Sequence, residues 1–165
     1  MKNVVFLALG SNIGNRDSNI KNAIKAIDRH ELCKVVKISS LYETKPFGYL
    51  DQENFYNGVI KVETDLNLDE LFELTLNVEE SIGRKKRFTW GPREIDIDIL
   101  FFNSEISNTG KLRVPHKGIA ERDFVLVPFA EIEPDFIHPE LNKKISDICK
   151  SVTENNIIRK ITDES

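Results

Sequence analysis

The chain has 165 residues, of which 40% are hydrophobic and 30% charged, a composition typical of folded proteins and not of disordered ones. Its net charge of −4 argues against a generally basic protein that binds nucleic acid or membrane surfaces. This length can form its own core, so residues 1–165 are expected to be a single domain. Two cysteines are too few for a disulfide framework and predict reduced thiols in the cytoplasm. Signal-peptide and transmembrane patterns are not expected.

The first part of the chain alternates between strand and helix patterns. Residues 4–9 (VVFLAL) are continuously apolar and stop at a glycine, which predicts a central strand buried on both faces. Apolar residues at helical spacing predict an amphipathic helix over roughly 16–29. β-Branched residues over 34–44 predict a strand that ends before a proline, and residues 55–64 (FYNGVIKVET) predict the next strand.

The following segments complete a recognisable order of elements. Asn67 and Glu70 have capping-box spacing, and the apolar positions after them predict a helix that ends at Gly83. Residues 95–102 (IDIDILFF) predict a strand. The order β-α-β-β-α-β is that of an α+β, ferredoxin-like core. A C-terminal extension is expected to add two short helices and a last strand, near 122–131, 143–152 and 157–161.

Two aspartates share one face of the predicted strand 95–102. Side chains alternate across a strand, so Asp96 and Asp98 face one side and three isoleucines face the other. Their Cα atoms should lie ~7 Å apart, where two carboxylates repel by roughly 2 kcal/mol at an effective dielectric near 20. Mg²⁺ would remove that repulsion, because it binds carboxylates together with water and phosphate. Two solvated aspartates facing nearby basic side chains are the alternative.

A basic segment comes directly before this strand. Residues 84–93 hold five cations and no acid, and glycine and proline frame them as a loop. Arginine and lysine bind phosphate oxygens, so cations followed at once by paired carboxylates fit a nucleoside triphosphate–metal site. Taken alone, the run also fits a solvated basic turn or a nucleic-acid patch.

Other candidate residues are less specific. Phe55 and Asn57 share a strand face and could offer a stacking ring and an amide to a flat ligand. Alternatively, Phe55 is an ordinary core residue and Asn57 caps a turn. His116 lies in a predicted loop, where it could reach a phosphate or be merely solvated.

Together these motifs resemble the signature of the 6-hydroxymethyl-7,8-dihydropterin pyrophosphokinase family of folate biosynthesis. The likeness covers about residues 3–150 and is strongest at Trp90-Gly91-Pro92-Arg93-x-x-Asp96-x-Asp98-Ile99-Leu100, with further matches at Leu9-Gly10-Ser11-Asn12, Val114-Pro115-His116 and Arg122-x-Phe124. It implies a ferredoxin-like enzyme that transfers the pyrophosphoryl group of ATP to the hydroxymethyl oxygen of the pterin and releases AMP.

The resemblance also implies roles for individual residues. Asp96 and Asp98 would bind two Mg²⁺ ions and would form the catalytic group with Arg84 and Arg93. The residues implied to contact ATP are Glu79, Arg84, Lys86, Arg93, Ile99, His116 and Arg122. Those implied to contact the pterin are Thr44, Phe47, Phe55, Asn57, Trp90 and Phe124, with Phe55 and Phe124 on either side of its ring. Either Lys86 or Arg87 would supply a second catalytic cation of the loop, and no general base is evident.

Two other functions are compatible with parts of the pattern. A polymerase-β-type nucleotidyltransferase also uses Gly-Ser and spaced aspartates, but there the Gly-Ser comes shortly before them, whereas Gly10-Ser11 is far ahead of Asp96. A non-catalytic RNA-binding module shares the ferredoxin-like order, but the aromatic RNP1 pattern is missing and the two aspartates would repel a phosphate backbone. The expected ligands are therefore ATP and the pterin, with no nucleic acid or membrane partner, and a monomer is favoured.

Overall fold

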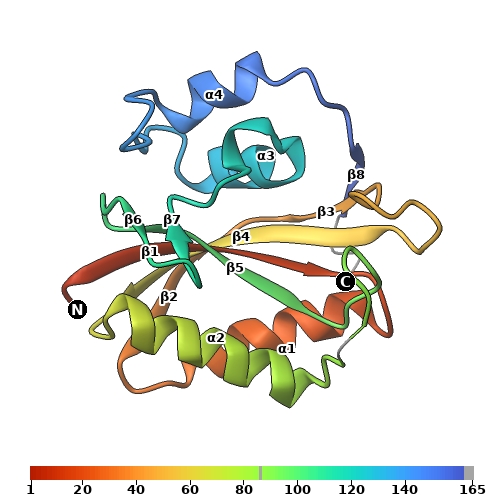
Figure 1. The fold of residues 1–165 in the computed structure, drawn as a ribbon, viewed down its shortest axis with the longest axis horizontal. Coiled ribbons are helices and arrows are strands. Elements are labelled where there is room, and N and C mark those ends of the chain that lie inside the picture. Colours follow the sequence, from red (N-terminus) through yellow and green to blue (C-terminus); the bar gives the residue numbers. More distant parts are fainter. Residues whose placement is uncertain (86, 162–165) are drawn as a thin grey trace.

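The computed structural model describes residues 1–85 and 87–161, in which a central sheet is covered by helices on both faces (Figure 1). The strand order is β5-β1-β4-β3-β8, and β2 also pairs with β4. The sheet strands are β1 (Asn3–Ser11), β2 (Cys33–Ile38), β3 (Leu41–Thr44), β4 (Phe55–Thr64), β5 (Asp96–Phe102) and β8 (Ile157–Ile161). The α-helices are α1 (Arg16–Asp28), α2 (Leu68–Ile82), α3 (Asp123–Ile132) and α4 (Ile145–Ser151). A small hairpin of β6 (Ser107–Asn108) and β7 (Arg113–Val114) and a 3₁₀ helix (Ile119–Glu121) connect β5 to α3.

The predicted ferredoxin-like order is confirmed. β1 pairs antiparallel with β4 and with β5, and the β2–β3 segment pairs antiparallel with the other edge of β4. The predicted C-terminal helices and last strand are also present, as α3, α4 and β8. In Figure 1, α1 and α2 cover one face of the sheet, while α3 lies on the other face and α4 packs on the outer side of α3.

The predicted strand over 34–44 is wrong in one respect, because it is two strands. β2 ends at Ile38 and β3 begins at Leu41, although both lie along the same edge of β4. At the interruption, the Ser39 hydroxyl accepts the Val59 N–H at 2.9 Å, and the Ser39 N–H donates to the Val59 carbonyl at 2.9 Å. A side chain thus takes part in the pairing, and this bends the chain without exposing the β4 backbone.

The predicted helix boundaries follow from local hydrogen bonds. At the start of α2, the Asn67 side chain accepts the Glu70 N–H at 2.8 Å, and the Glu70 carboxylate accepts the Asn67 N–H at 2.9 Å. This is the expected capping box. The helix ends at Gly83, whose φ of 107° is a left-handed conformation that favours glycine. The basic loop leaves the helix from that point.

Two cores form on the two faces of the sheet. β1 contributes to both, with Val5, Leu7 and Leu9 packed under α1 and α2 and Phe6 packed under α3 and α4. The strand is buried on both faces, as its continuous apolar run predicts. Ile95, Ile97 and Ile99 also lie in the core under α1 and α2. Asp96 and Asp98 are thereby directed to the opposite face, toward α3.

Candidate active site

The antiparallel register brings the candidate residues to one end of the sheet. Gly10 on β1 is paired with Asn57 on β4 and with Asp96 on β5. β3 reaches the same end of the sheet, because Thr44 is paired with Phe55, two residues before Asn57 on β4. Neighbouring strands lie ≈4.7–4.9 Å apart, so residues far apart in the sequence line a single surface.

A central cavity lies over this row, between the sheet and the start of α3. Ten of the predicted site residues line it: Thr44, Phe47, Phe55, Asn57, Trp90, Arg93, Asp96, Asp98, Arg122 and Phe124. Ala8, Leu9, Gly10, Lys45 and Val125 complete the lining. The cavity combines aromatic rings and an amide at one side with carboxylates and guanidinium groups at the other, which suits a flat ligand beside an anionic one.

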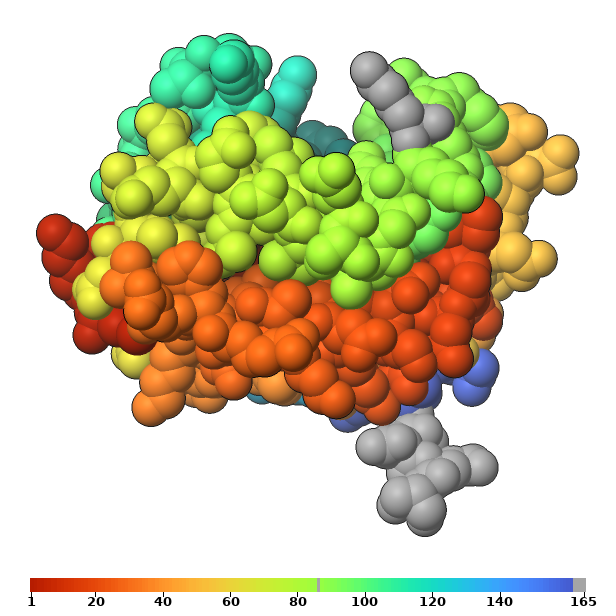
Figure 2. Space-filling view, turned by 90° about the horizontal axis from the view of Figure 1, so that it is seen from below, coloured from red at the N-terminus to blue at the C-terminus, as the bar shows by residue number. Residues whose placement is uncertain are grey.

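Two further hollows adjoin the central cavity. The basic recess is lined by Glu79, Arg84, Arg87 and other residues of α2 and the loop, and it shares Arg93 with the central cavity. The His116 recess is lined by Ile99, His116 and residues of the β6–β7 region, and it shares Asp98. Figure 2 looks onto the α1–α2 side and shows a notch between the segment that follows β5 and the loop that follows α2. The predicted ATP residues other than Lys86 lie along these hollows and the central cavity.

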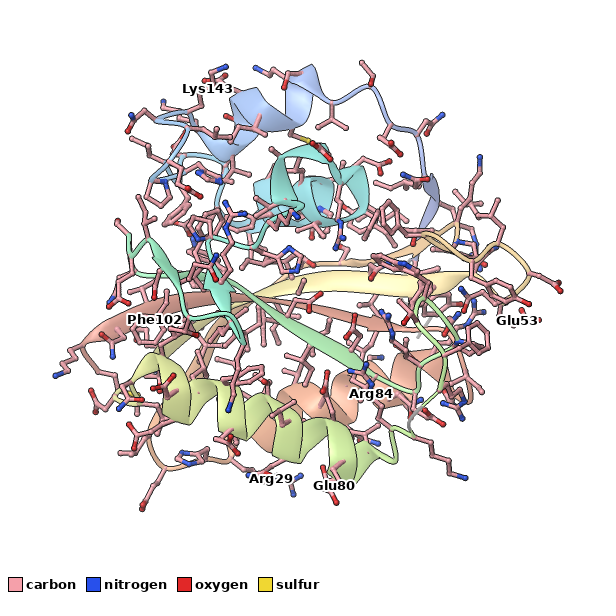
Figure 3. The ribbon with its side chains drawn as sticks, viewed as in Figure 1. Arg29, Glu53, Glu80, Arg84, Phe102 and Lys143 are labelled. Carbon is pink, nitrogen blue, oxygen red and sulfur yellow. The ribbon has the colours of Figure 1, made fainter. Side chains whose placement is uncertain are left out.

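Asp96 is held between two arginines. Arg84 Nη1 lies 3.2 Å from Asp96 Oδ1, and Arg93 Nη1 lies 3.0 Å from Asp96 Oδ2. Figure 3 shows Arg84 at the end of α2, beside the first residues of β5. Two cations therefore already face one of the carboxylates, at the place where a triphosphate would bring further negative charge.

Glu79 positions this arrangement from inside the protein. The residue is only 6% exposed, and its Oε2 accepts hydrogen bonds from Arg84 Nη1 and from the Ile97 N–H, both at 2.8 Å. Burial raises the pKa of Glu79, while the Ile97 N–H and the Arg84 charge oppose that rise. The carboxylate thus joins α2, β5 and the basic loop at one point.

Asp98 lies in a different environment. Burial, and then the charge of Asp96, raise the pKa of Asp98 to about 7, even though 38% of its side chain is accessible through the cavity. His116 Nε2 lies 3.9 Å from Asp98 Oδ2, which is beyond hydrogen-bond distance. Burial, and then the Arg122 charge, lower the pKa of His116 to about 4, so the imidazole is neutral near pH 7. His116 Nδ1 accepts the Gly118 N–H at 3.3 Å, which leaves the proton on Nε2, facing Asp98.

The donor set at this point fits Mg²⁺. Two carboxylates share one face of β5, and burial, together with the charge of Asp96, disfavours the ionised form of Asp98, which a bound cation would stabilise. Within residues 1–85 and 87–161, no group of three or more His, Cys, Asp or Glu side chains is placed to hold a metal. A Mg²⁺ ion held here would take its other ligands from water and phosphate, as this ion commonly does.

On the aromatic side of the cavity, Asn57 is fixed by its neighbours. Its Nδ2 donates to the Thr44 hydroxyl at 2.7 Å, and Thr44 is fully buried. A Cβ atom at position 10 would lie 2.6 Å from Asn57 Oδ1, so only glycine leaves room for this amide. Gly10 is thus a site residue whose role the sequence pattern did not reveal.

The segment 45–54 and the basic loop are joined over the mouth of the cavity. The rings of Phe47 and Trp90 meet edge to face at 5.1 Å between centroids. Gln52 Nε2 donates to the Trp90 carbonyl at 2.7 Å. Asn12, only 2% exposed, donates to Gln52 Oε1 at 2.8 Å and accepts the Arg93 N–H at 2.7 Å. Asn12 and Gln52 therefore connect both loops to the end of β1, a role that sequence reasoning missed.

Of the two candidate second cations in the basic loop, the structure describes only Arg87. Arg87 forms two hydrogen bonds with the Glu94 carboxylate, at 2.6 and 2.8 Å, which hold the pKa of Glu94 at about 2. Lys86, the alternative second cation, lies outside the described residues.

None of the described helices is long and apolar enough to cross a membrane.

Comparison with known proteins identifies the family. The profile of the 7,8-dihydro-6-hydroxymethylpterin-pyrophosphokinase family matches residues 6–134. A 2-amino-4-hydroxy-6-hydroxymethyldihydropteridine pyrophosphokinase of Aquifex aeolicus is 46% identical over 143 residues, which cover 87% of this chain and 88% of the relative. The Bacillus subtilis enzyme of the same name is 47% identical over 132 residues, covering 80% of this chain and 79% of the relative.

A solved structure shares the fold. The HPPK-DHPS chain of Plasmodium falciparum, solved as a triple mutant with pteroate, superposes with a TM-score of 0.69 at 18% identity. The match covers 90% of this chain but only 43% of that one, so this chain spans less than half of the HPPK-DHPS protein. The fold and the sequence matches together define an ATP-dependent pyrophosphokinase. The chain belongs to the 7,8-dihydro-6-hydroxymethylpterin-pyrophosphokinase family. The nucleotidyltransferase and RNA-binding alternatives are not favoured.

Proposed function

We propose that this chain transfers the pyrophosphoryl group of ATP to the hydroxymethyl oxygen of 6-hydroxymethyl-7,8-dihydropterin. One observation carries the proposal: the Asp96–Asp98 pair lines the same cavity as the Phe55 and Phe124 rings and the Asn57 amide. A ligand that is flat at one end and reacts with a polyphosphate at the other end fits this arrangement. The hydroxymethyl oxygen bonds to the β-phosphorus of ATP and loses its proton to water, the bond from that phosphorus to the α-phosphate oxygen breaks, and AMP leaves.

The pterin is proposed to bind at the aromatic side of the central cavity. Phe55 and Phe124 stack against its ring, and Asn57, fixed by Thr44, hydrogen-bonds its polar edge. Phe47 and Trp90, 41% and 42% exposed at the mouth, are proposed to close over it. Such closure would exclude water from the transferred group.

The triphosphate is proposed to extend from the central cavity into the two adjoining hollows. Arg84, Arg93 and Arg122 carry the charge that matches its oxygens, and neutral His116 offers its Nε2–H as a donor. Ile99 lies 3% exposed at the His116 recess, where it is proposed to contact the adenine. Lys86 is proposed to add a further contact, and Glu79 is proposed to take part chiefly through its bond to Arg84.

Asp96 and Asp98 are proposed to hold two Mg²⁺ ions. When bound, these ions would neutralise phosphate charge and polarise the oxygens of the displacement. The protein's own contribution is placement: the β5 register fixes both carboxylates, and Arg93 reaches both the central cavity and the basic recess. Positioning and charge neutralisation supply most of the catalysis in phosphoryl transfer.

Three coarser features complete the proposal. A monomer is proposed, since the described residues of one chain are enough to line the central cavity. The strands of the site and β8 belong to one sheet, and α4 packs against α3, which supports one domain over residues 1–165. Cys33 and Cys149 are unpaired, which supports action in the reducing cytoplasm.

Product analysis tests the proposed reaction. The chain is mixed with ATP, Mg²⁺ and 6-hydroxymethyl-7,8-dihydropterin, and nucleotides are separated by chromatography. AMP should appear in equal amount to the pterin diphosphate. The double variant Asp96→Asn/Asp98→Asn should be nearly inactive, whereas Asp135→Asn, which removes a charge from a side chain that is 83% exposed, should act as wild type. Formation of ADP, or of free pyrophosphate, in place of AMP would refute the reaction.

A further inference from the structure

The C-terminal segment joins two walls of the central cavity. After α4 the chain runs past the first turn of α3 and reaches the sheet edge, where β8 pairs with β3 (Figure 1). On the way, the Asn156 carbonyl accepts the Lys45 N–H at 2.9 Å. The Asn156 N–H donates to Asp123 Oδ2 at 2.7 Å, and Asn156 Nδ2 donates to Asp123 Oδ1 at 2.9 Å. Asn156 is thus bonded to both sides.

Each bonding partner of Asn156 is adjacent to residues that line the cavity. Lys45 follows Thr44 at the end of β3, and both line one wall. Asp123 is the first residue of α3 and lies between Arg122 and Phe124, which line the opposite wall. Asp123 is not itself among the lining residues. It therefore acts on the cavity only through the backbone that it anchors.

The hydrogen bonds of Asp123 are suited to fix the start of α3 relative to the C-terminal segment. The residue is 7% exposed, and its carboxylate accepts three N–H groups, the third from Ile157 at 3.3 Å. Hydrogen bonds to a charged acceptor are stronger than neutral ones, and a buried group that loses its partners is costly. The family profile ends at residue 134, so Asn156 and β8 lie outside the region that carries the family signature.

We propose that Asp123 and Asn156 are positioning residues, which set the distance between the Phe124 ring and the Thr44–Lys45 wall and thereby the affinity for the pterin. They do so without touching the ligand. The inference rests on the proposed function, because it takes the ring of Phe124 to be one side of the pterin pocket.

Binding measurements on the full chain test this role. The dissociation constant of 6-hydroxymethyl-7,8-dihydropterin is measured by calorimetry with Mg²⁺ and α,β-methylene-ATP, in which the bond to be broken is blocked. Asp123→Ala removes all three acceptor contacts and should weaken pterin binding about tenfold. Asn156→Ala keeps the backbone bonds and removes the two contacts of Nδ2, to Asp123 and, on the exposed side, to Glu154 Oε2 at 2.9 Å, so it should fold as wild type and weaken binding about threefold.

Two controls separate positioning from general stability. Arg159→Ala removes an ion pair between β8 and Glu43, at 2.9 Å, but leaves Asn156 in place, so pterin affinity should not change. Ile148→Val reduces packing in the buried core between α3 and α4 without touching these bonds, and the folded fraction should bind the pterin normally. A loss of affinity in either control equal to that of Asp123→Ala would overturn the inference.

A double-mutant cycle with Phe124→Ala gives the specific readout. If Asp123 acts by placing the ring, Asp123→Ala should add little once the ring is absent. An unchanged tenfold loss in the Phe124→Ala background, or wild-type affinity in both Asp123→Ala and Asn156→Ala, would overturn the inference alone. Wild-type pterin binding by Phe124→Ala itself would instead refute the proposed pterin pocket, and this inference with it.

Discussion

Replacing Gly10 with alanine should selectively impair pterin binding. The added Cβ would lie 2.6 Å from Asn57 Oδ1 and 3.6 Å from the Phe55 ring, and the first distance is shorter than real Cβ contacts allow. The amide must therefore move, and with it the hydrogen bond to Thr44. Loss of one or two neutral hydrogen bonds corresponds to about 1–2 kcal/mol, which is about a 5- to 30-fold rise in the pterin dissociation constant.

The fold should tolerate this change, so a loss of pterin affinity can be assigned to the site and not to unfolding. Alanine in a strand interior is less costly than glycine in conformational entropy, by roughly 0.5–1 kcal/mol. This entropy gain offsets the loss of the Asn57–Thr44 hydrogen bond, which is about 1 kcal/mol, so Gly10→Ala should melt close to wild type while its pterin affinity falls, as measured by calorimetry with α,β-methylene-ATP present. In an Asn57→Ala background the same substitution should have little effect. An equal loss of affinity in both backgrounds would refute the steric argument.

Three further outcomes follow from the charges around β5. Because the pKa of Asp98 is raised to about 7, protons compete with the metal for this carboxylate below that pH. The Mg²⁺ affinity of the nucleotide complex should therefore fall by up to tenfold for each pH unit below 7. A calorimetric Mg²⁺ affinity that stays constant from pH 6 to 8 would contradict this. Glu79→Gln should loosen Arg84 and raise the KM for ATP about three- to tenfold, whereas Glu73→Gln, at an exposed position of α2 that does not line the basic recess, should not change it in steady-state assays. Arg93→Ala should lower kcat; a rise in KM alone would contradict a transition-state role.

Much of the fold could be predicted because its signals are local. The Asn67–Glu70 capping box, the left-handed Gly83 and the alternation in residues 95–102 are each contained within a few residues. The break between β2 and β3 could not be predicted, because it depends on how Ser39 pairs with β4. The β6–β7 hairpin was also missed, since strands of two residues are too short to show a period.

The residues of the candidate site also fall into two groups, those with a local sequence signal and those without one. Arg93, Asp96 and Asp98 lie close together in the sequence, so their combination was readable as a phosphate–metal pattern. Asn12 and Asp123 were missed because their partners are distant: Asn12 bonds to a residue 81 positions away, and Asp123 to one 33 positions away. Each looks like an ordinary polar residue until the chain has folded around it.

The central claim is that the Asp96–Asp98 pair anchors divalent metal against a triphosphate. A crystal structure with Mg²⁺, α,β-methylene-ATP and 6-hydroxymethyl-7,8-dihydropterin tests it most directly. We expect metal density bonded to oxygens of both carboxylates and to the nucleotide phosphates, with the pterin between Phe55 and Phe124. Metal bound to the phosphates alone, with neither aspartate as a ligand, would contradict the account.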